Sequence, residues 1–340
     1  MVKIALLGFG NVGRAFARYL YACGEAAQYR ICAVADISGG LILPEGEEDR
    51  WVLEMQEQSR LVADYADRGV FSDILSYIDS LPLNGISMLV ECMPTNPADG
   101  QPALDLIHRA IGHRLPVVTV DKGPIVHGFE TLKSLAQERG VGLAYSGTTG
   151  VRPPAEIAGC RVLEIRGIFN GTTNYILTEM QERDLSFSRA LRQAQENGIA
   201  EPNPQLDIEG WDTACKLLIL ANEWMNARAS ITNVMRIGIG PETEQMISEA
   251  KAAGHRIRLI GRARLAGDRV KLSVAPKMCG PQSQFYSISG TSKGAVFATR
   301  EKGELFAAGV SGREAIAKII LDDVKQVLAE IRNAGLEIRD

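Results

Sequence analysis

The sequence predicts an α/β fold in two parts, a doubly wound parallel sheet followed by a second unit of the α+β kind. Residues 1–145 alternate short apolar segments with helical ones, and the first apolar segment ends in a glycine-rich turn. After Tyr145 the alternation stops, and strands and helices follow one another less regularly. Alternating strands and helices with a glycine turn at the first crossover are typical of a parallel, doubly wound sheet.

The composition is that of a globular chain with room for two domains. Of the 340 residues, 46% are apolar and 23% charged, and the net charge of −4 is spread along the chain without a basic patch. Nucleic acid and membranes are therefore not expected as partners. The N-terminus shows no signal peptide. Six dispersed cysteines without a C-x-x-C pair favour a reduced, cytoplasmic protein, and four scattered histidines predict no metal site.

The first predicted strand, residues 2–7, runs into the turn GFGNVG, and a helical pattern follows until Gly24. In that context G-x-G-x-x-G is a dinucleotide-binding signal, because the glycines let the backbone approach a pyrophosphate at the N-terminus of the helix. The alternative is a plain glycine turn between a strand and a helix. The Rossmann-type interpretation assigns cofactor binding to Gly8, Gly10, Asn11, Val12 and Gly13.

Asp36 ends the second predicted strand, residues 31–35, and lies 23 residues after Gly13. A carboxylate there can accept hydrogen bonds from the ribose hydroxyls of an adenosine. No arginine or lysine follows in residues 37–40 that could bind a 2′-phosphate. NAD is therefore favoured over NADP.

The rest of the first half supplies the remaining strands and helices. We expect peripheral helices at 47–63 and 72–80, strands at 87–92, 116–120 and 142–145, and helices at 100–113 and 129–138. Pro94 and Thr95 lie in the loop after the strand at 87–92, where a nicotinamide would bind. Lys122 follows the next strand and is a candidate for substrate or cofactor contact, with a solvated loop lysine as the alternative.

The second half is predicted to contain a loop at 146–154, a strand at 161–169, and helices at 176–183 and 186–197. Strands at 236–240 and within 256–275 flank a helix at 242–253, and a long amphipathic helix covers 313–331.

The segment EPNPQLDIEGWDTACKLLILA, residues 201–221, brings several charges together. Its loop carries Glu201, Asp207 and Glu209, and the helix that begins at Trp211 carries Asp212 and Lys216 four residues apart, on one face. Such a pair is often only a solvated surface ion pair. The three carboxylates beside it suggest an active site instead.

Several long motifs make the chain resemble the homoserine dehydrogenase family, in its short form. Besides GFGNVG they are TVDKGP, in the place of a T-x-N-K-like motif, GIFNGTTNYILTEM, AEPNPQLDIEGWDTACKLLILA and GTSKGAVFATREKGELFAAG. The resemblance covers most of the chain. It implies an NAD(P)-dependent oxidoreductase of amino-acid biosynthesis that interconverts L-homoserine and L-aspartate 4-semialdehyde, and a homodimer formed through the sheet of the second half.

The resemblance also implies roles for particular residues. Lys216 would transfer the proton, with Asp212 near the amino-acid substrate and Lys122 near the reacting oxygen. The implied substrate-binding residues are Glu201, Asp207, Thr172, Asn170 and Arg152. An amine desolvated in a closed cleft suits proton transfer, since its pKa can fall towards neutrality.

The domain organisation follows from the same reading. We expect a dinucleotide-binding domain at 1–145, completed by a C-terminal helix at 311–335, and a substrate-binding, catalytic and dimerisation domain at 146–310. We expect neither a regulatory domain after residue 340 nor a kinase domain before residue 1.

The loop at 146–159 departs from the family pattern. Ser146 replaces a usual glutamate, and Val151-Arg152-Pro153-Pro154 replaces a glycine-rich stretch. We therefore expect activity without a requirement for potassium or sodium. A different amino- or hydroxy-acid alcohol or aldehyde is the alternative substrate, and a non-catalytic dinucleotide sensor is a third interpretation that Lys216 disfavours.

Overall fold

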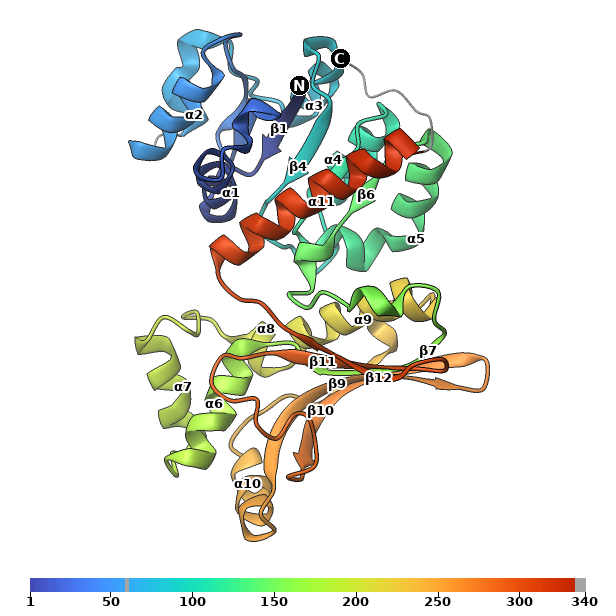
Figure 1. Cartoon of the computed structure of the whole chain (residues 1–340). Helices are drawn as coiled ribbons and strands as arrows, with labels where there is room; N and C mark the ends of the chain where they lie inside the picture. The colour runs from blue at the N-terminus through green and yellow to red at the C-terminus, as the bar shows by residue number, and fades with distance from the viewer. Residues whose placement is uncertain (59–60, 334–340) are drawn as a thin grey trace. The chain divides into compact units, whose positions relative to one another are not determined.

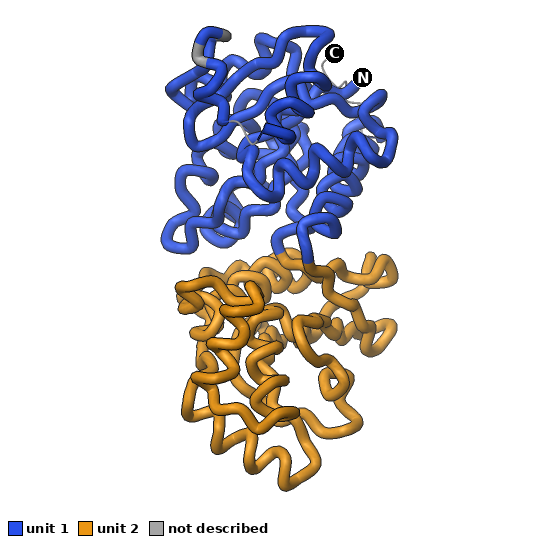
Figure 2. Tube along the Cα trace, turned by 90° about the vertical axis from the view of Figure 1, so that its left-hand side faces the viewer, with its two compact units in different colours: residues 1–148, 312–340 blue, residues 149–311 orange. Residues whose placement is uncertain are grey.

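The structure is a computed structural model that describes residues 1–58 and 61–333. The chain forms two compact units (Figures 1 and 2). The first consists of Met1–Thr148 with the C-terminal segment that begins at Gly312, and the second of Thr149–Ser311.

The first unit is built on a six-stranded sheet with the strand order β3-β2-β1-β4-β5-β6. Its strands are β1 (Val2–Leu7), β2 (Tyr29–Asp36), β3 (Gly39–Ile42), β4 (Met88–Glu91), β5 (Val117–Thr119) and β6 (Leu143–Ala144). All neighbours are parallel except β2 and β3, which form an antiparallel hairpin. The predicted doubly wound α/β class is confirmed, whereas the hairpin strand β3 was not foreseen.

Helices cover both faces of this sheet (Figure 1). They are α1 (Asn11–Ala22), α2 (Glu48–Glu57), α3 (Ile74–Ser80), α4 (Ala103–Gly112), α5 (Lys122–Arg139) and α11 (Arg313–Asn333). Phe16 of α1, Met55 of α2 and Ile320 of α11 enter one core with β1, β2 and β4. Short 3-10 helices lie at Glu25–Ala27, Val62–Arg68, Pro82–Asn84 and Ser146–Thr148.

Two helices begin earlier than their apolar periodicity predicts. Helix α5 begins at Lys122, seven residues before the predicted start at 129, because the Asp121 carboxylate accepts a hydrogen bond from the Gly123 amide and caps it. Helix α6 (Gly171–Glu182) begins at Gly171 because Asn170 caps it through the Thr173 amide. Lys122 therefore lies in the first turn of a helix. The C-terminal helix was expected to reach 335, and residues 334–335 lie outside the described residues.

The second unit is an α+β unit on a sheet with the order β12-β11-β7-β9-β10-β8. Its strands are β7 (Val162–Ile168), β8 (Val234–Arg236), β9 (Arg256–Ala266), β10 (Arg269–Cys279), β11 (Gly294–Thr299) and β12 (Gly303–Ala308). Only β8 and β10 pair in parallel. Its other helices are α7 (Phe187–Glu196), α8 (Gln205–Ile208), α9 (Trp211–Met225) and α10 (Thr243–Ala252), with 3-10 turns at Ala155–Ile157 and Ile231–Asn233.

The strand predicted at 236–240 is misplaced. Strand β8 ends at Arg236, and the chain beyond it pairs by single hydrogen bonds, from the Ile237 amide to Val274 O and from the Ile239 amide to Ile208 O. The predicted loop at 201–210 contains the one-turn helix α8. Both differences arise from tertiary partners that local periodicity does not reveal.

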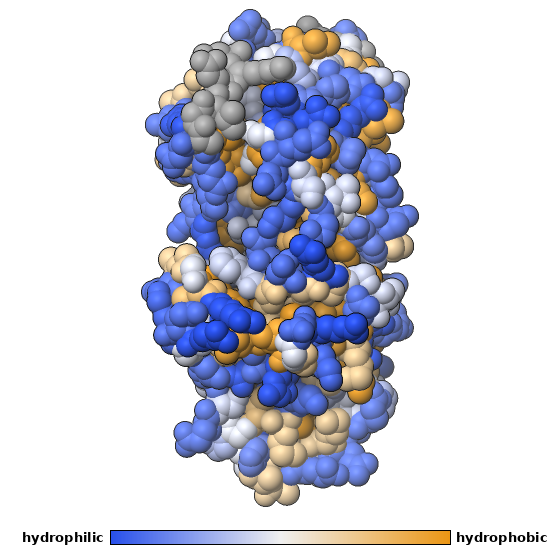
Figure 3. All heavy atoms as spheres, turned by 90° about the vertical axis from the view of Figure 1, so that its right-hand side faces the viewer, coloured by the Kyte–Doolittle hydropathy of each residue, from blue (hydrophilic) through white to orange (hydrophobic). Residues whose placement is uncertain are grey.

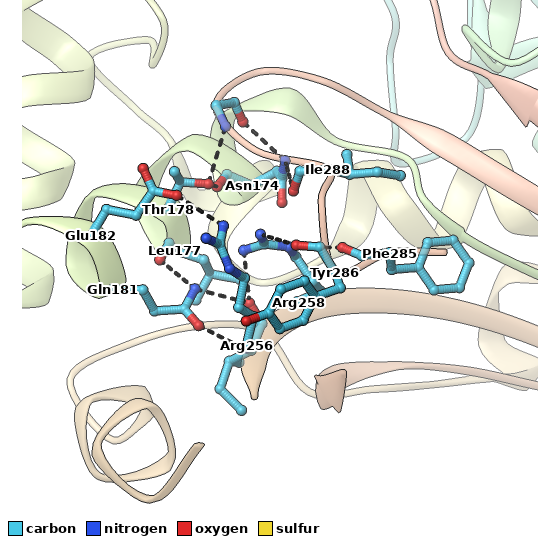
Figure 4. A network of polar contacts seen from close by, with 12 residues as sticks. Asn174, Leu177, Thr178, Gln181, Glu182, Arg256, Arg258, Phe285, Tyr286 and Ile288 are labelled. Atoms are coloured by element: carbon cyan, nitrogen blue, oxygen red, sulfur yellow. Dashed lines mark hydrogen bonds and ion pairs between the residues drawn. The ribbon is translucent and has the colours of Figure 1, made fainter. Parts of the chain in front are cut away.

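A buried polar network fixes α6 in the second unit (Figure 4). The Arg258 guanidinium is fully buried and donates to the carbonyls of Phe285 and Tyr286. Burial lowers the pKa of Arg258 to about 10, so the group keeps its charge at neutral pH. Asn174 of α6 donates to the Ile288 and Gly290 carbonyls. This network ties down α6, whose N-cap is Asn170.

Hydrophilic residues predominate on the face that Figure 3 shows, and apolar residues gather there in smaller patches. Within the described residues, no helix is both long enough and apolar enough to cross a membrane.

Candidate active site

The three glycines of the turn in the first unit differ in the space around them. A Cβ added to Gly8, which has a φ of 100°, would lie 2.7 Å from the Cys92 carbonyl carbon, and one added to Gly13 would lie 2.2 Å from Gly8 O. A Cβ at Gly10 would meet nothing within 4 Å. Packing within the protein therefore accounts for Gly8 and Gly13, and Gly10 leaves the backbone at the start of α1 accessible.

The N-terminus of α1 fits an anionic group. The helix begins with Asn11 and Val12, and Gly10 at the N-cap provides no side chain to bind their amides. Free amide groups and the helix dipole together favour a phosphate at this position.

Asp36 ends β2, as predicted, but its carboxylate already accepts three hydrogen bonds. They come from the amide of Ser38 at 2.8 Å, the hydroxyl of Ser38 at 2.5 Å and the amide of Val62 at 2.8 Å. A carboxylate offers about four acceptor positions, so capacity for a further donor remains. Through the bond from Val62, Asp36 also holds the 3-10 helix Val62–Arg68 against the end of β2.

The carboxyl ends of β4 and β5 carry the remaining predicted residues of the first unit. Pro94 is exposed and Thr95 half-buried in the loop after β4, and Lys122 is half-buried at the start of α5. The loop packs closely on this helix, because a Cβ added to Gly123 would lie 2.7 Å from Asn96 O.

In the second unit, four predicted residues form one hydrogen-bonded cluster. The Asn170 side-chain amide donates to Asp207 Oδ1 at 2.6 Å and to Asp212 Oδ2 at 2.8 Å. Lys216 Nζ donates to the same Asp212 Oδ2 at 2.5 Å and to Phe169 O at 2.9 Å. Helices α6, α8 and α9 thus each supply part of the cluster.

The cluster is shielded from water. The side chains of Lys216 and Asp212 are only 12% and 13% exposed, which excludes the interpretation of a solvated surface ion pair. Burial, followed by the nearby charge of Asp212, raises the pKa of Asp207. The arrangement holds an amine in contact with one carboxylate and links that carboxylate to a second through Asn170, which suits proton transfer to a polar substrate.

The other predicted residues of the second unit lie around this cluster. The Thr172 hydroxyl donates to Ile199 O at 3.1 Å, and the Gln195 side chain donates to Glu201 O. The side chain of Glu201 is exposed, and so is that of Arg152. Near the start of α9, the Arg236 guanidinium lies 3.3 Å from the centre of the Trp211 ring.

The chain matches the family model of homoserine dehydrogenase over residues 154–324. A homoserine dehydrogenase of Methanocaldococcus jannaschii is 33% identical over 335 residues, which cover 95% of this chain and 97% of that protein. The chain belongs to the homoserine dehydrogenase family. An NAD(+)-dependent homoserine dehydrogenase of Pseudomonas canavaninivorans is 32% identical over 343 residues, 95% of each chain. The crystal structure of a putative homoserine dehydrogenase from Archaeoglobus fulgidus has a TM-score of 0.82 and 31% identity, covering 96% of this chain and 99% of that one.

Membership of the homoserine dehydrogenase family, which consists of NAD(P)-dependent oxidoreductases, confirms the resemblance inferred from the sequence and the expectation of an enzyme. The alternative of a related dehydrogenase with a different substrate is not favoured. The interpretation as a non-catalytic dinucleotide sensor is not favoured either, because the relatives are named as enzymes.

The loop at 146–159, which departs from the pattern of the homoserine dehydrogenase family, is anchored at its start and again at Gly150 and Val151. The Ser146 amide donates to Asp323 Oδ2 at 3.0 Å. Val151 is buried and forms a β-bridge with Gly309, and the Val310 amide donates to Gly150 O. Among the described residues, no group of three or more histidine, cysteine, aspartate or glutamate side chains could hold a metal ion.

Sequence reasoning missed three residues of these sites. Phe169 contributes only its carbonyl, which no side-chain pattern reveals. Ser38 donates its hydroxyl hydrogen bond to Asp36 across a local turn. Glu91 is a fully buried acid at the end of β4, and a charged residue ending an otherwise apolar strand was the signal that could have found it.

Proposed function

We propose that the protein interconverts L-homoserine and L-aspartate 4-semialdehyde, with Lys216 as the proton donor and acceptor. The observation that carries the proposal is the shielded contact of Lys216 Nζ with Asp212 and Phe169 O, in a chain of the homoserine dehydrogenase family.

In the reducing direction, NAD(P)H would supply a hydride to the aldehyde carbon. Lys216 donates a proton to the oxygen as the carbonyl becomes an alcohol, and in the reverse direction its amine accepts that proton. Asp212 lies 2.5 Å from Nζ, so it fixes the amine and balances its charge. General acid–base catalysis of this kind contributes about 10²–10⁴-fold to a rate.

The neighbouring residues recognise the amino acid. Asp207 and Glu201 attract the substrate ammonium group, and Asn170 and Thr172 bind its polar groups. Arg152 offers a planar fork suited to the substrate carboxylate, and Lys122 acts near the reacting oxygen. The burial of Asn170 and its hydrogen bond to Asp207 support these roles, because they pre-orient both side chains.

The first unit is the dinucleotide-binding domain, completed by α11, and the second is the substrate-binding, catalytic and dimerisation domain. The turn Gly8-Phe9-Gly10-Asn11-Val12-Gly13 binds the pyrophosphate, and Pro94 and Thr95 lie beside the nicotinamide. The open space at Gly10 supports this assignment.

NAD is the preferred cofactor in this proposal. The carboxylate of Asp36 would repel a 2′-phosphate, and residues 37–40 offer no cation to bind it. The relative from Pseudomonas canavaninivorans is described as NAD(+)-dependent, which supports the same preference.

The protein is proposed to act as a homodimer in the cytoplasm. Met278 of β10 and Phe306 of β12 are 49% and 43% exposed on the second unit's sheet, as apolar residues of an interface between copies would be. All six cysteines are free, which supports a reducing compartment.

Steady-state kinetics test the proposed reaction. The purified protein should reduce NAD with L-homoserine and oxidise NADH with L-aspartate 4-semialdehyde. Other amino alcohols, tested at the same concentrations, should react far more slowly. Equal or faster turnover of another alcohol would overturn the proposed substrate, and the absence of turnover with every substrate would overturn the enzymatic role.

A further inference from the structure

Two buried carboxyl groups in the first unit have no part in the function proposed above. Glu91 ends β4 and is 0% exposed, and Asp121 precedes α5 and is 1% exposed. They follow or end neighbouring parallel strands, so both lie at the carboxyl edge of the sheet. Acids are rarely buried so completely without a cation beside each of them.

A single hydroxyl group connects the two residues. The Thr119 hydroxyl donates to Glu91 Oε2 and accepts a hydrogen bond of 3.0 Å from the Asp121 amide. Asp121 Oδ1 accepts from the Gly123 amide at 2.8 Å, whereas Oδ2 is buried without a hydrogen-bond partner among the described residues. An ionised oxygen in that position is costly, because it has lost water and gained no donor.

The charges around the pair do not compensate two negative groups. Lys122 is the cation that acts on Asp121, and the neighbouring Cys92 thiol stays protonated because burial raises its pKa. Burial, followed by the charge of Asp121, raises the pKa of Glu91 to about 8. Burial also raises the pKa of Asp121, although hydrogen bonds from Thr95 and Gly123 and the charge of Lys122 act in the opposite direction.

The pair also holds the loop that follows β4. The Met93 amide donates to Glu91 Oε1 at 2.6 Å, and Thr95 lies near enough to Asp121 to act on the pKa of its carboxyl group. A Cβ added to Gly100 would lie 2.7 Å from Gly123 O, so the end of the loop packs closely on the start of α5. A change in charge at the pair therefore acts directly on residues 93–95.

We propose that Glu91 and Asp121 share one proton and are positioning residues, which keep Met93–Thr95 in the conformation that binds the nicotinamide cofactor. The inference rests on the proposed function of this unit. Losing the proton places two charges in one buried site, and their repulsion displaces the loop. Cofactor affinity then falls as the pH rises through the alkaline range.

The proton itself can be observed without any cofactor. Infrared spectra of the cofactor-free protein should show the carbonyl band of a buried carboxylic acid at pH 6 and its loss by pH 10. Asp121→Asn and Glu91→Gln each leave one buried acid without its partner, so both should shift the pH at which this band disappears. Asn can still cap α5, and the second variant serves if the first does not fold. Asp105→Asn, which changes an exposed acid of α4, is the matched control and should titrate as the unmodified protein does.

The loop can be followed by fluorescence titration with NADH at pH 6.5 and pH 9.5. The unmodified protein and Asp105→Asn should bind at least about tenfold more weakly at pH 9.5, because one pKa unit corresponds to a tenfold change. In Asp121→Asn the two affinities should agree within about twofold.

Two results would overturn the inference: an infrared spectrum without the band at pH 6, or a pH dependence of NADH affinity that Asp121→Asn shares with the unmodified protein. If NADH binds at neither pH, the proposed function of the unit is wrong, and so is the proposed role of the loop. The infrared titration still tests whether Glu91 and Asp121 share a proton.

Discussion

Two pairs of neighbouring acids lie in the sites described above, and the two pairs differ in the groups that surround them. Asp207 and Asp212, in the second unit, are bridged by the Asn170 amide, and Asp212 also contacts the Lys216 ammonium. In the first unit, the Thr119 hydroxyl donates to the Glu91 carboxyl group and accepts from the backbone amide of Asp121. The first arrangement keeps charges in place for a polar substrate, and the second favours a retained proton. An ammonium group in direct contact with one of the acids, as Lys216 is with Asp212, thus distinguishes the first pair from the second.

Removing the cation from the first pair should have the largest effect. Lys216→Ala should lower kcat by about 10²–10⁴-fold, the usual contribution of general acid–base catalysis. NADH affinity should stay unchanged, since the proposed phosphate site is the Gly8–Gly13 turn. Steady-state kinetics and NADH fluorescence measure the two quantities.

The matched control is Lys251→Ala, which removes a lysine paired with Asp184 on the surface of the same unit. It should leave kcat within about twofold. A loss below tenfold in Lys216→Ala would return the Asp212–Lys216 pair to a structural role.

The proton of the second pair should make stability depend on pH. Because the pKa of Glu91 is raised on folding, the folded protein binds more protons than the unfolded chain between about pH 4.5 and pH 8. The stability that these protons provide is full below the unfolded pKa and is lost as the pH rises through the folded pKa.

Asp121→Asn should therefore flatten part of the fall in the free energy of unfolding between pH 5 and pH 9. The change is about 1.4 kcal/mol for each pKa unit by which the variant lowers the folded pKa of Glu91. Urea unfolding at each pH measures this. Parallel curves for the variant and the unmodified protein would show that the pair does not titrate in this range.

Removing the bridge of the first pair should have a moderate effect. Asn170→Ala leaves Asp207 and Asp212 without their common donor and α6 without its N-cap. We expect a rise in KM for L-homoserine of about tenfold, since a lost hydrogen bond to a charged group costs about 1.5–3 kcal/mol. The lost cap should reduce stability by about 1 kcal/mol.

Ser186→Ala, which removes the N-cap of α7, is the control for the loss of a cap. It should reduce stability similarly and leave KM unchanged. If both variants change KM alike, the effect of Asn170→Ala comes from the helix and not from the site.

A smaller effect is expected at Asp36, an acid that is neither buried nor paired with another. Asp36→Asn should lower the preference for NAD over NADP, expressed as a ratio of kcat/KM, by a few-fold to about tenfold. Two causes act here: the charge that repels a 2′-phosphate disappears, and the donors of Ser38 and Val62 lose a charged acceptor. A strong NADP preference in the unmodified enzyme would contradict the assignment.

The smallest effect is expected from monovalent cations. Replacing potassium chloride by choline chloride at equal ionic strength should leave kcat and KM for L-homoserine unchanged, because the loop at 146–159 lacks the expected glutamate. A steep rise of activity with potassium would show that other oxygen atoms supply a cation site.

The sequence predicted the fold best where local signals agreed. Strand β1 occupies its predicted residues because an apolar run ends directly at the glycine turn. Asp121 and Asn170 are N-caps, and their types signalled helix starts that apolar periodicity alone placed too late. Strand β3 could not be anticipated from Gly39-Gly40-Leu41-Ile42, because two glycines are unusual in a strand. The reason for Gly40 lies in the folded chain, since a Cβ at this position would lie 2.3 Å from the ring of Tyr77.

The active site was predictable in part for the same reason. Asp212 and Lys216 could be paired from their spacing on one helix. The bridge from Asn170 to both aspartates spans 37 and 42 residues, and the Val62 amide reaches Asp36 across 26, so only the folded chain brings these groups together.

The two hydrogen bonds of Lys216 also fix a direction. An ammonium group has three N–H bonds in tetrahedral arrangement, and those aimed at Phe169 O and Asp212 Oδ2 leave a single axis for the third. In the proposed reaction, a substrate oxygen on that axis would receive the proton. One that is bound equally tightly but off the axis would not, so the proposed mechanism selects among aldehydes by the orientation of one N–H bond as well as by the residues that hold them.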